Sequence, residues 1–160
     1  MGPVINENQL AKIESYLERG RQEAKLLTGG SRATEPGLEK GLFVKPTIFD
    51  EVPAQATIAR EEIFGPVLSV LSFDNIDDVI RTANDTMYGL AAAVWTKDIN
   101  VALKVAKGLR AGTVWVNAYH TTGLYNMPYG GYKQSGLGRE LGDLGLEEYM
   151  ETKSIQIKLQ

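Results

Sequence analysis

The sequence predicts an α/β fold in which a parallel sheet carries flanking helices and the chain ends in a separate strand. Apolar, strand-like runs at 66–73, 89–95 and 113–117 alternate with segments of helical periodicity. The links between them are short, and strand–helix–strand units of this kind form right-handed crossovers with parallel strands. The final stretch, 153–159, alternates polar and apolar side chains, which indicates a strand with one apolar face.

The first third of the chain is expected to hold one clear helix and less regular strands. Asn6 is a typical N-cap residue, and Gln9 three positions later is its capping partner. A short strand is expected at 25–27, and 42–49 is β-rich around Pro46, which predicts an edge or irregular strand. The helix should run to about residue 22, with an apolar face made by Leu10, Ile13 and Leu17.

Two further amphipathic helices should separate the three later strands, and another is expected over about 140–149. Trp95 and Trp115 lie in apolar strand-like runs, so both are expected in the core. The N-caps of the two separating helices are Asn75 or Asp74 for the first and Asp98 for the second.

Composition excludes several classes of protein. The chain has 160 residues, 43% of them hydrophobic and 23% charged, which is typical of a globular domain. The net charge of −3 is spread along the chain, which argues against nucleic-acid partners. No apolar run reaches transmembrane length and no leader pattern is visible, so no membrane partner and a cytoplasmic location are expected. Without cysteine, and with His120 as the one histidine, no metal site is expected.

The stretch 60–67 combines two adjacent acids with an aromatic residue and a Gly–Pro turn, directly before a hydrophobic run. Gly65 and Pro66 impose an unusual, rigid backbone. Carboxylates beside a buried strand favour a ligand site at the strand mouth, where open α/β sheets bind their ligands. A surface loop with solvated acids explains the same spacing, and the spacing alone leaves both interpretations open.

Six blocks of sequence, in order and in register, carry a resemblance to the aldehyde dehydrogenase superfamily. The resemblance covers essentially the whole chain and corresponds to the C-terminal third of such an enzyme. The blocks are residues 61–67 (EEIFGPV), 83–85 (AND), 88–91 (YGLA), 112–117 (GTVWVN), 128–136 (PYGGYKQSG) and 138–140 (GRE).

This resemblance implies an NAD(P)+-dependent enzyme that oxidises an aldehyde to a carboxylic acid, with NAD or NADP as cofactor. In the family a thiolate attacks the aldehyde, a hydride passes to the cofactor, and water activated by a glutamate hydrolyses the thioester. The nucleophilic cysteine and the general-base glutamate belong to the part of the family not covered here, so the chain alone is expected to be inert. The alternative is a non-catalytic binding or assembly module with the same fold.

The resemblance also implies four cofactor contacts. Glu62 matches the glutamate that hydrogen-bonds the nicotinamide ribose, and Phe64 matches the aromatic residue packed beside it. Gln9 and Lys12 match positions near the cofactor, although a capping residue and a solvated lysine explain them equally well. Glu61 has no role in the family and is interpreted as a solvated neighbour.

The loop 118–131 matches the wall of the tunnel that admits the aldehyde. Several aromatic side chains there would suit either a quaternary ammonium such as betaine aldehyde or a plain alkyl or aryl aldehyde. His120 is expected to be a hydrogen-bonding loop residue, and Asn117 to brace the loop. The expected substrate-binding residues are Tyr119, Thr122, Tyr125, Met127 and Tyr129.

We expect residues 1–150 to form the C-terminal part of the catalytic domain and residues 151–160 to form an oligomerisation strand. A lone terminal strand must pair with a sheet of its own chain or of a neighbour. The resemblance implies a homo-oligomer, a dimer or a tetramer, joined to the remainder of the dehydrogenase chain. The expected interface residues are Arg139, Glu151, Ile155 and Ile157.

Overall fold

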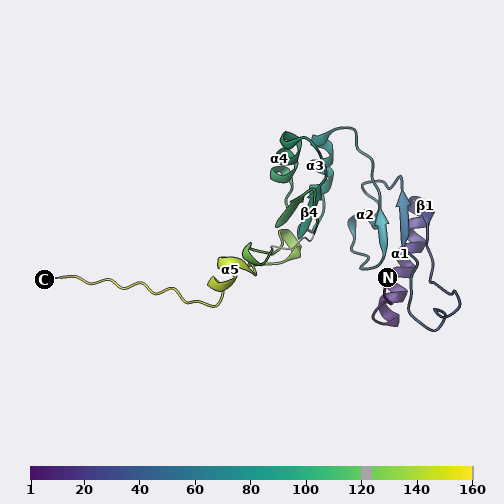
Figure 1. Cartoon of the computed structure of the whole chain (residues 1–160), viewed down its shortest axis with the longest axis horizontal. Helices are drawn as coiled ribbons and strands as arrows, with labels where there is room; N and C mark the ends of the chain where they lie inside the picture. The colour runs from purple at the N-terminus through teal and green to yellow at the C-terminus, as the bar shows by residue number, and fades with distance from the viewer. Residues whose placement is uncertain (120–123, 160) are drawn as a thin grey trace. The chain divides into compact units, whose positions relative to one another are not determined.

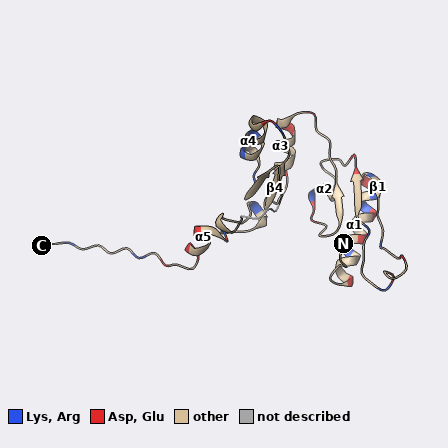
Figure 2. Cartoon of the chain, in the orientation of Figure 1, with Lys and Arg blue, Asp and Glu red and all other residues tan. Residues whose placement is uncertain are grey.

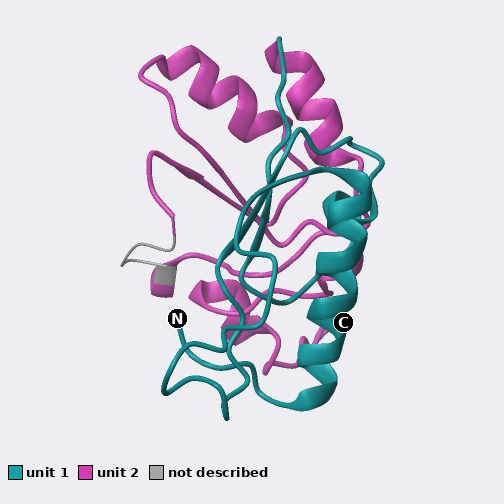
Figure 3. Ribbon diagram, turned by 90° about the vertical axis from the view of Figure 1, so that its right-hand side faces the viewer, with its two compact units in different colours: residues 1–74 teal, residues 75–160 magenta. Residues whose placement is uncertain are grey.

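The computed structural model describes residues 1–119 and 124–159, and these fall into two compact units (Figure 3). The first unit comprises residues 1–74 and the second comprises residues 75–160. This division follows from contacts within the chain. The predicted division at 150/151 concerns assembly with another subunit and stays a prediction.

The first unit is a three-stranded mixed sheet with two helices (Figure 1). The strands lie in the order β1-β2-β3, with β1 antiparallel and β3 parallel to the central β2. Its elements are α1 (Glu7–Glu23), β1 (Lys25–Thr28), β2 (Thr47–Asp50), α2 (Thr57–Arg60) and β3 (Val67–Ser69).

Helix α1 forms as its sequence predicts. The side chain of Asn6 accepts a hydrogen bond from the backbone nitrogen of Gln9 at 2.9 Å, which satisfies one of the free N–H groups at the helix start. The periodic apolar residues Leu10, Ile13 and Leu17 are buried and pack around Phe49 of β2 in the core. This packing fixes α1 against the sheet.

The expected edge strand around Pro46 is instead the central strand of this sheet. Strand β2 begins at Thr47, one residue after Pro46, so the missing N–H of the proline falls outside the paired residues. Thr47 is buried, and its hydroxyl accepts from the nitrogen of Gly30 at 2.8 Å.

The second unit has a two-stranded parallel sheet, in which β4 pairs with β5 and α4 packs against both strands. Asn75 and Asp98 cap α3 and α4 through their side-chain oxygens, as their sequence positions predict. The elements are α3 (Ile76–Asn84), β4 (Ala91–Val94), α4 (Ile99–Gly108), β5 (Thr113–Val116), η1 (Leu124–Asn126), η2 (Lys133–Ser135) and α5 (Gly142–Glu147).

The prediction of one parallel sheet with three consecutive strands is therefore wrong. Strand β3 pairs with β2 in the first unit, from Thr47↔Val67 to Phe49↔Ser69, while β4 pairs with β5 in the second. The predicted parallel direction is correct for the β4–β5 pair. A short apolar run indicates a strand but does not identify its hydrogen-bonding partner, which explains the error.

The terminal strand is also not formed within this chain. Residues 151–159 have no strand assignment, and their side chains are exposed. A strand requires a partner edge, and no described part of the chain supplies one to this segment. The oligomerisation role of the segment remains a prediction.

Of the two tryptophans expected in the core, only Trp115 is buried; Trp95 is 63% exposed. The last residue pair of the β4–β5 ladder is Val94↔Val116, so Trp95 lies just beyond the strand. Acidic and basic side chains are interspersed along both units (Figure 2). No helix among residues 1–119 and 124–159 is long and apolar enough to cross a membrane.

Candidate functional site

The two acids and the aromatic residue singled out in the sequence lie in a short connection between α2 and β3, residues 61–65, here called the presenting loop. Glu62 and Phe64 are exposed, Phe64 at 73%, whereas Ile63 between them is buried in the core. No described residue hydrogen-bonds the carboxylate of Glu62. The side chain of Ile63 therefore anchors the loop in the core, while the carboxylate of Glu62 and the ring of Phe64 remain accessible.

Phe64 holds an unusual backbone conformation, with φ of 55°. A residue with a side chain seldom adopts the left-handed region, and such residues persist only where the surrounding structure enforces them. Gly65, next in the chain, lies against α1: a Cβ atom there would be 2.7 Å from Cδ1 of Ile13. Glycine allows the close approach of the loop to the helix.

Helix α1 is hydrogen-bonded to this loop through Gln9. The side-chain nitrogen of Gln9 donates to the backbone oxygens of Ile63 and Phe64, each at 3.1 Å. Only part of the predicted cap is therefore present, because the backbone of Gln9 bonds to Asn6 while its amide group bonds to the presenting loop.

Glu61 was interpreted as a solvated neighbour, and its side chain is exposed to solvent as predicted, but it also has a partner on α1. Its carboxylate accepts a hydrogen bond of 2.8 Å from the hydroxyl of Tyr16. Sequence reasoning missed Tyr16, although a signal existed: it lies seven residues after Gln9, two turns along the same face of α1. Lys12 lies on this part of the helix as well, and its ammonium group is 5.9 Å from the centre of the Tyr16 ring.

The expected substrate-binding residues occupy different settings. Tyr119 packs its ring on Trp115, with ring centres 5.0 Å apart, while Tyr125 and Met127 are exposed. Tyr129 is half-buried, and its backbone pairs with that of Glu140 through two hydrogen bonds of 2.7 Å. Thr122 and His120 lie outside the described residues.

Asn117 was expected to brace the loop that follows it. Instead its amide group bonds the backbone nitrogen and oxygen of Thr96, each at 2.8 Å, and thereby ties the end of β5 to the residues after β4. Lys133 follows the loop in sequence, and its ammonium group donates to the backbone oxygens of Asn84 and Thr86. These carbonyls lie at and just beyond the C-terminus of α3, where a cation is favourable.

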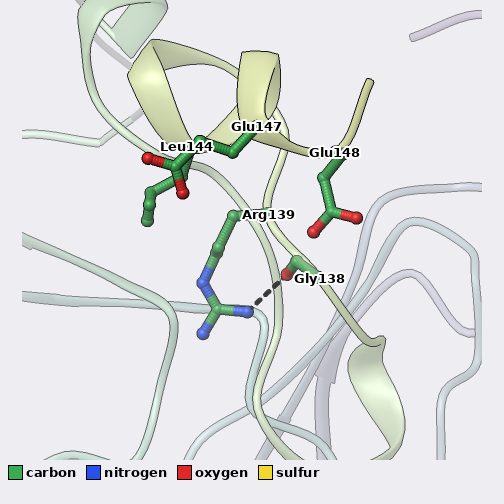
Figure 4. Close-up of a pocket in the computed structure, with 5 residues that line it drawn as sticks. All are labelled: Gly138, Arg139, Leu144, Glu147 and Glu148. Carbon is green, nitrogen blue, oxygen red and sulfur yellow. Dashed lines mark hydrogen bonds between the residues drawn. The ribbon is translucent and has the colours of Figure 1, made fainter. Parts of the chain in front are cut away.

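The expected interface residues lie near and beyond α5. The guanidinium group of Arg139 donates to the backbone oxygens of Gly131 at 3.1 Å and Gly138 at 2.6 Å. Arg139 also lines a pocket of about 330 Å³, together with the acidic residues Glu147 and Glu148 (Figure 4). Glu151, Ile155 and Ile157 are exposed, so their interface role remains a prediction.

The acidic and histidine side chains of the described residues form no group of three or more that could hold a metal ion. Glu62 supplies acceptor oxygens, Phe64 supplies an aromatic face, and α1 fixes the backbone that carries them.

Comparison with known proteins shows the family of the chain. The sequence model of the Aldehyde dehydrogenase family matches residues 1–155. Betaine aldehyde dehydrogenase of Bacillus subtilis is 52% identical over 155 residues, which cover 96% of this chain and 31% of that protein. The human mitochondrial aldehyde dehydrogenase is 49% identical over 159 residues, 99% of this chain and 30% of that protein. The chain thus spans about a third of the length of these relatives.

Solved structures give the same result. A betaine aldehyde dehydrogenase from Staphylococcus aureus matches with a TM-score of 0.92 and 47% identity, covering 96% of this chain and 30% of that one. An aldehyde dehydrogenase from Mycobacterium tuberculosis, solved in complex with NAD+, matches with a TM-score of 0.92 and 43% identity over 99% of this chain and 32% of that one. This chain belongs to the aldehyde dehydrogenase family.

Proposed function

We propose that this chain is the C-terminal portion of an NAD+-dependent aldehyde dehydrogenase, and that Glu62 and Phe64 contact the nicotinamide ribose. The observation that carries the proposal is the presenting loop, which is fastened to α1 while Glu62 and Phe64 remain exposed. An ionised carboxylate has only acceptor oxygens, so it suits two neighbouring ribose hydroxyls. The exposed ring of Phe64 offers a flat apolar surface beside them.

NAD+ is the proposed cofactor because the solved relative from Mycobacterium tuberculosis carries it. The cofactor supplies the hydride acceptor, and the protein contributes binding and orientation. Glu62 would hold the ribose through hydrogen bonds, and Phe64 would limit its movement. The absence of any other described hydrogen bond to the Glu62 carboxylate leaves its oxygens available for this purpose.

The remaining parts of the reaction would come from elsewhere in the longer protein. The sequence contains no cysteine, so the thiol nucleophile would lie outside these 160 residues, as would the general base. The chain alone would therefore oxidise no aldehyde. We propose that its loop residues form part of the tunnel wall for an aldehyde substrate: Tyr119, Thr122, Tyr125, Met127 and Tyr129.

The substitution Glu62→Gln in the longer enzyme tests this proposal. A hydrogen bond to a charged group contributes about 1.5–3 kcal/mol, so hydride transfer should slow by roughly ten- to a hundred-fold. The KM for aldehyde should change less. Glu14→Gln removes one carboxylate from the exposed side of α1 and is the matched control. An unchanged turnover number together with unchanged NAD+ affinity in Glu62→Gln would contradict the proposal and favour a non-catalytic module.

A further inference from the structure

One face of α1 contacts both sides of the presenting loop. Gln9, Ile13 and Tyr16 are spaced four and three residues apart, so they share one face of the helix. Gln9 bonds to the backbone of Ile63 and Phe64, and Tyr16 bonds to Glu61 at the other end of the loop. These contacts flank Glu62 and leave its side chain exposed.

The contact between Ile13 and Gly65, which lies between those of Gln9 and Tyr16 along the helix, is one of close steric packing. Gly65 approaches Ile13 so closely that no side chain larger than hydrogen fits between them, because an added Cβ would lie 2.7 and 2.8 Å from two carbons of Ile13. Ile13 is itself fully buried, so it has little room to move aside. The same face of α1 thus holds the loop through hydrogen bonds from Gln9 and Tyr16 and through the packed side chain of Ile13.

The conformation of Phe64 requires such a restraint. Its φ of 55° is unfavourable for a residue with a side chain, and its ring is too exposed for packing within the described chain to enforce it. The bond from Gln9 to the oxygen of Phe64 fixes the peptide group that follows the strained residue. This bond is the contact best placed to select the strained conformation.

The hydrogen bonds also limit what else Gln9 can do. A side-chain amide nitrogen carries two hydrogens, and both have backbone oxygens as acceptors here. Gln9 in this conformation has no N–H left to donate to a cofactor. The amide nitrogen of Gln9 therefore serves to hold the loop.

We propose that Gln9 and Tyr16 are positioning residues that clamp the presenting loop and so set the orientation in which Glu62 and Phe64 meet the nicotinamide ribose. This inference rests on the proposed function for those two side chains. The clamp itself exists without cofactor, so it can be examined in the cofactor-free enzyme as well as through binding.

The test uses the longer enzyme with Gln9→Ala, Gln9→Glu and Tyr16→Phe, and with Glu14→Ala on the exposed side of α1 as the matched control. Two quantities are measured: deuterium uptake by the peptide spanning 61–67 without cofactor, and the dissociation constant for NAD+ by calorimetry. Gln9→Ala should raise the uptake and weaken NAD+ binding about tenfold, the scale of one or two net hydrogen bonds. Tyr16→Phe, which removes a single oxygen atom, should act in the same direction.

Gln9→Glu gives a signature that simple loss of stability would not give. A carboxylate at this position would face two carbonyl oxygens and repel them, whereas its protonated form would regain one donor. The NAD+ affinity of Gln9→Glu should therefore recover as the pH falls, while that of Gln9→Ala should not. A combined Gln9→Ala and Glu62→Ala variant should lose less affinity than the two single changes summed, because Gln9 acts through the loop.

The outcomes separate the clamp from the function on which it rests. If the Gln9 and Tyr16 variants kept normal uptake and NAD+ affinity while Glu62→Gln weakened binding, the clamp would be overturned and the ribose contact would stand. Equal effects from Glu14→Ala would overturn it as well. If Glu62→Gln also bound NAD+ normally, the proposed function would fail, and the clamp's role would fail with it.

Discussion

The contact between Gly20 of α1 and Phe49 of β2 controls how closely the helix approaches its sheet. Phe49 is fully buried, and a Cβ atom added at Gly20 would lie 2.5 and 2.6 Å from two carbons of its ring. Gly20→Ala therefore sets two effects against each other. Alanine favours a helix over glycine by about 1 kcal/mol, but overpacking a rigid core costs about 1–3 kcal/mol. We expect a net loss of about 0–2 kcal/mol in the free energy of unfolding.

A double-mutant cycle with Phe49→Leu isolates the steric part. Leucine has no ring, so the added methyl group should find room, and the double variant should be more stable than the sum of the single changes by about 1–2 kcal/mol. Urea unfolding followed by circular dichroism measures each corner of the cycle. If Gly20→Ala stabilised the protein by about 1 kcal/mol and the two changes were additive, the helix would not be packed on Phe49 as described.

Three other changes test further parts of the molecule. Tyr129→Ala should alter the turnover of betaine aldehyde relative to propanal without changing NAD+ affinity; equal relative rates would remove Tyr129 from the tunnel wall. Truncation of the longer enzyme after Thr152 should yield smaller species on a sizing column, because it removes the exposed apolar side chains expected to pack against a partner subunit. An unchanged oligomeric mass would contradict the role of this segment as an oligomerisation strand. Burial raises the pKa of Glu23, but hydrogen bonds from Thr57 and Ile58 outweigh this effect and hold the pKa below its usual value. The ionised Glu23 carboxylate should therefore stabilise the fold, and this stabilisation should be lost as the pH falls through the lowered pKa. An acid unfolding profile unchanged by Glu23→Gln would refute this.

The sequence was sufficient for features that depend on local periodicity. The start of α1 at Asn6, its buried face and the caps at Asn75 and Asp98 all follow from residues within one or two turns. The identification of Glu62 and Phe64 came from resemblance, and the structure adds that both are exposed on a fastened loop.

Contacts between residues far apart in the sequence could not be predicted from local patterns. The pairing of β3 with β2 joins residues about twenty positions apart, and an apolar run holds no information about which strand lies alongside it. The amide of Gln9 reaches backbone oxygens 54 and 55 residues away, so a short-range capping rule could account for only its backbone bond. Trp95 was misplaced because the ladder ends one residue before it.

We propose above that the presenting loop holds Glu62 and Phe64 in place to contact the nicotinamide ribose. A crystal structure of the longer enzyme with NAD+ bound measures this directly. We expect both ribose hydroxyls within hydrogen-bonding distance, about 2.5–3.0 Å, of the Glu62 carboxylate, with Gln9 still bonded to the oxygens of Ile63 and Phe64. A ribose held by other residues, with the Glu62 carboxylate left in solvent, would contradict it.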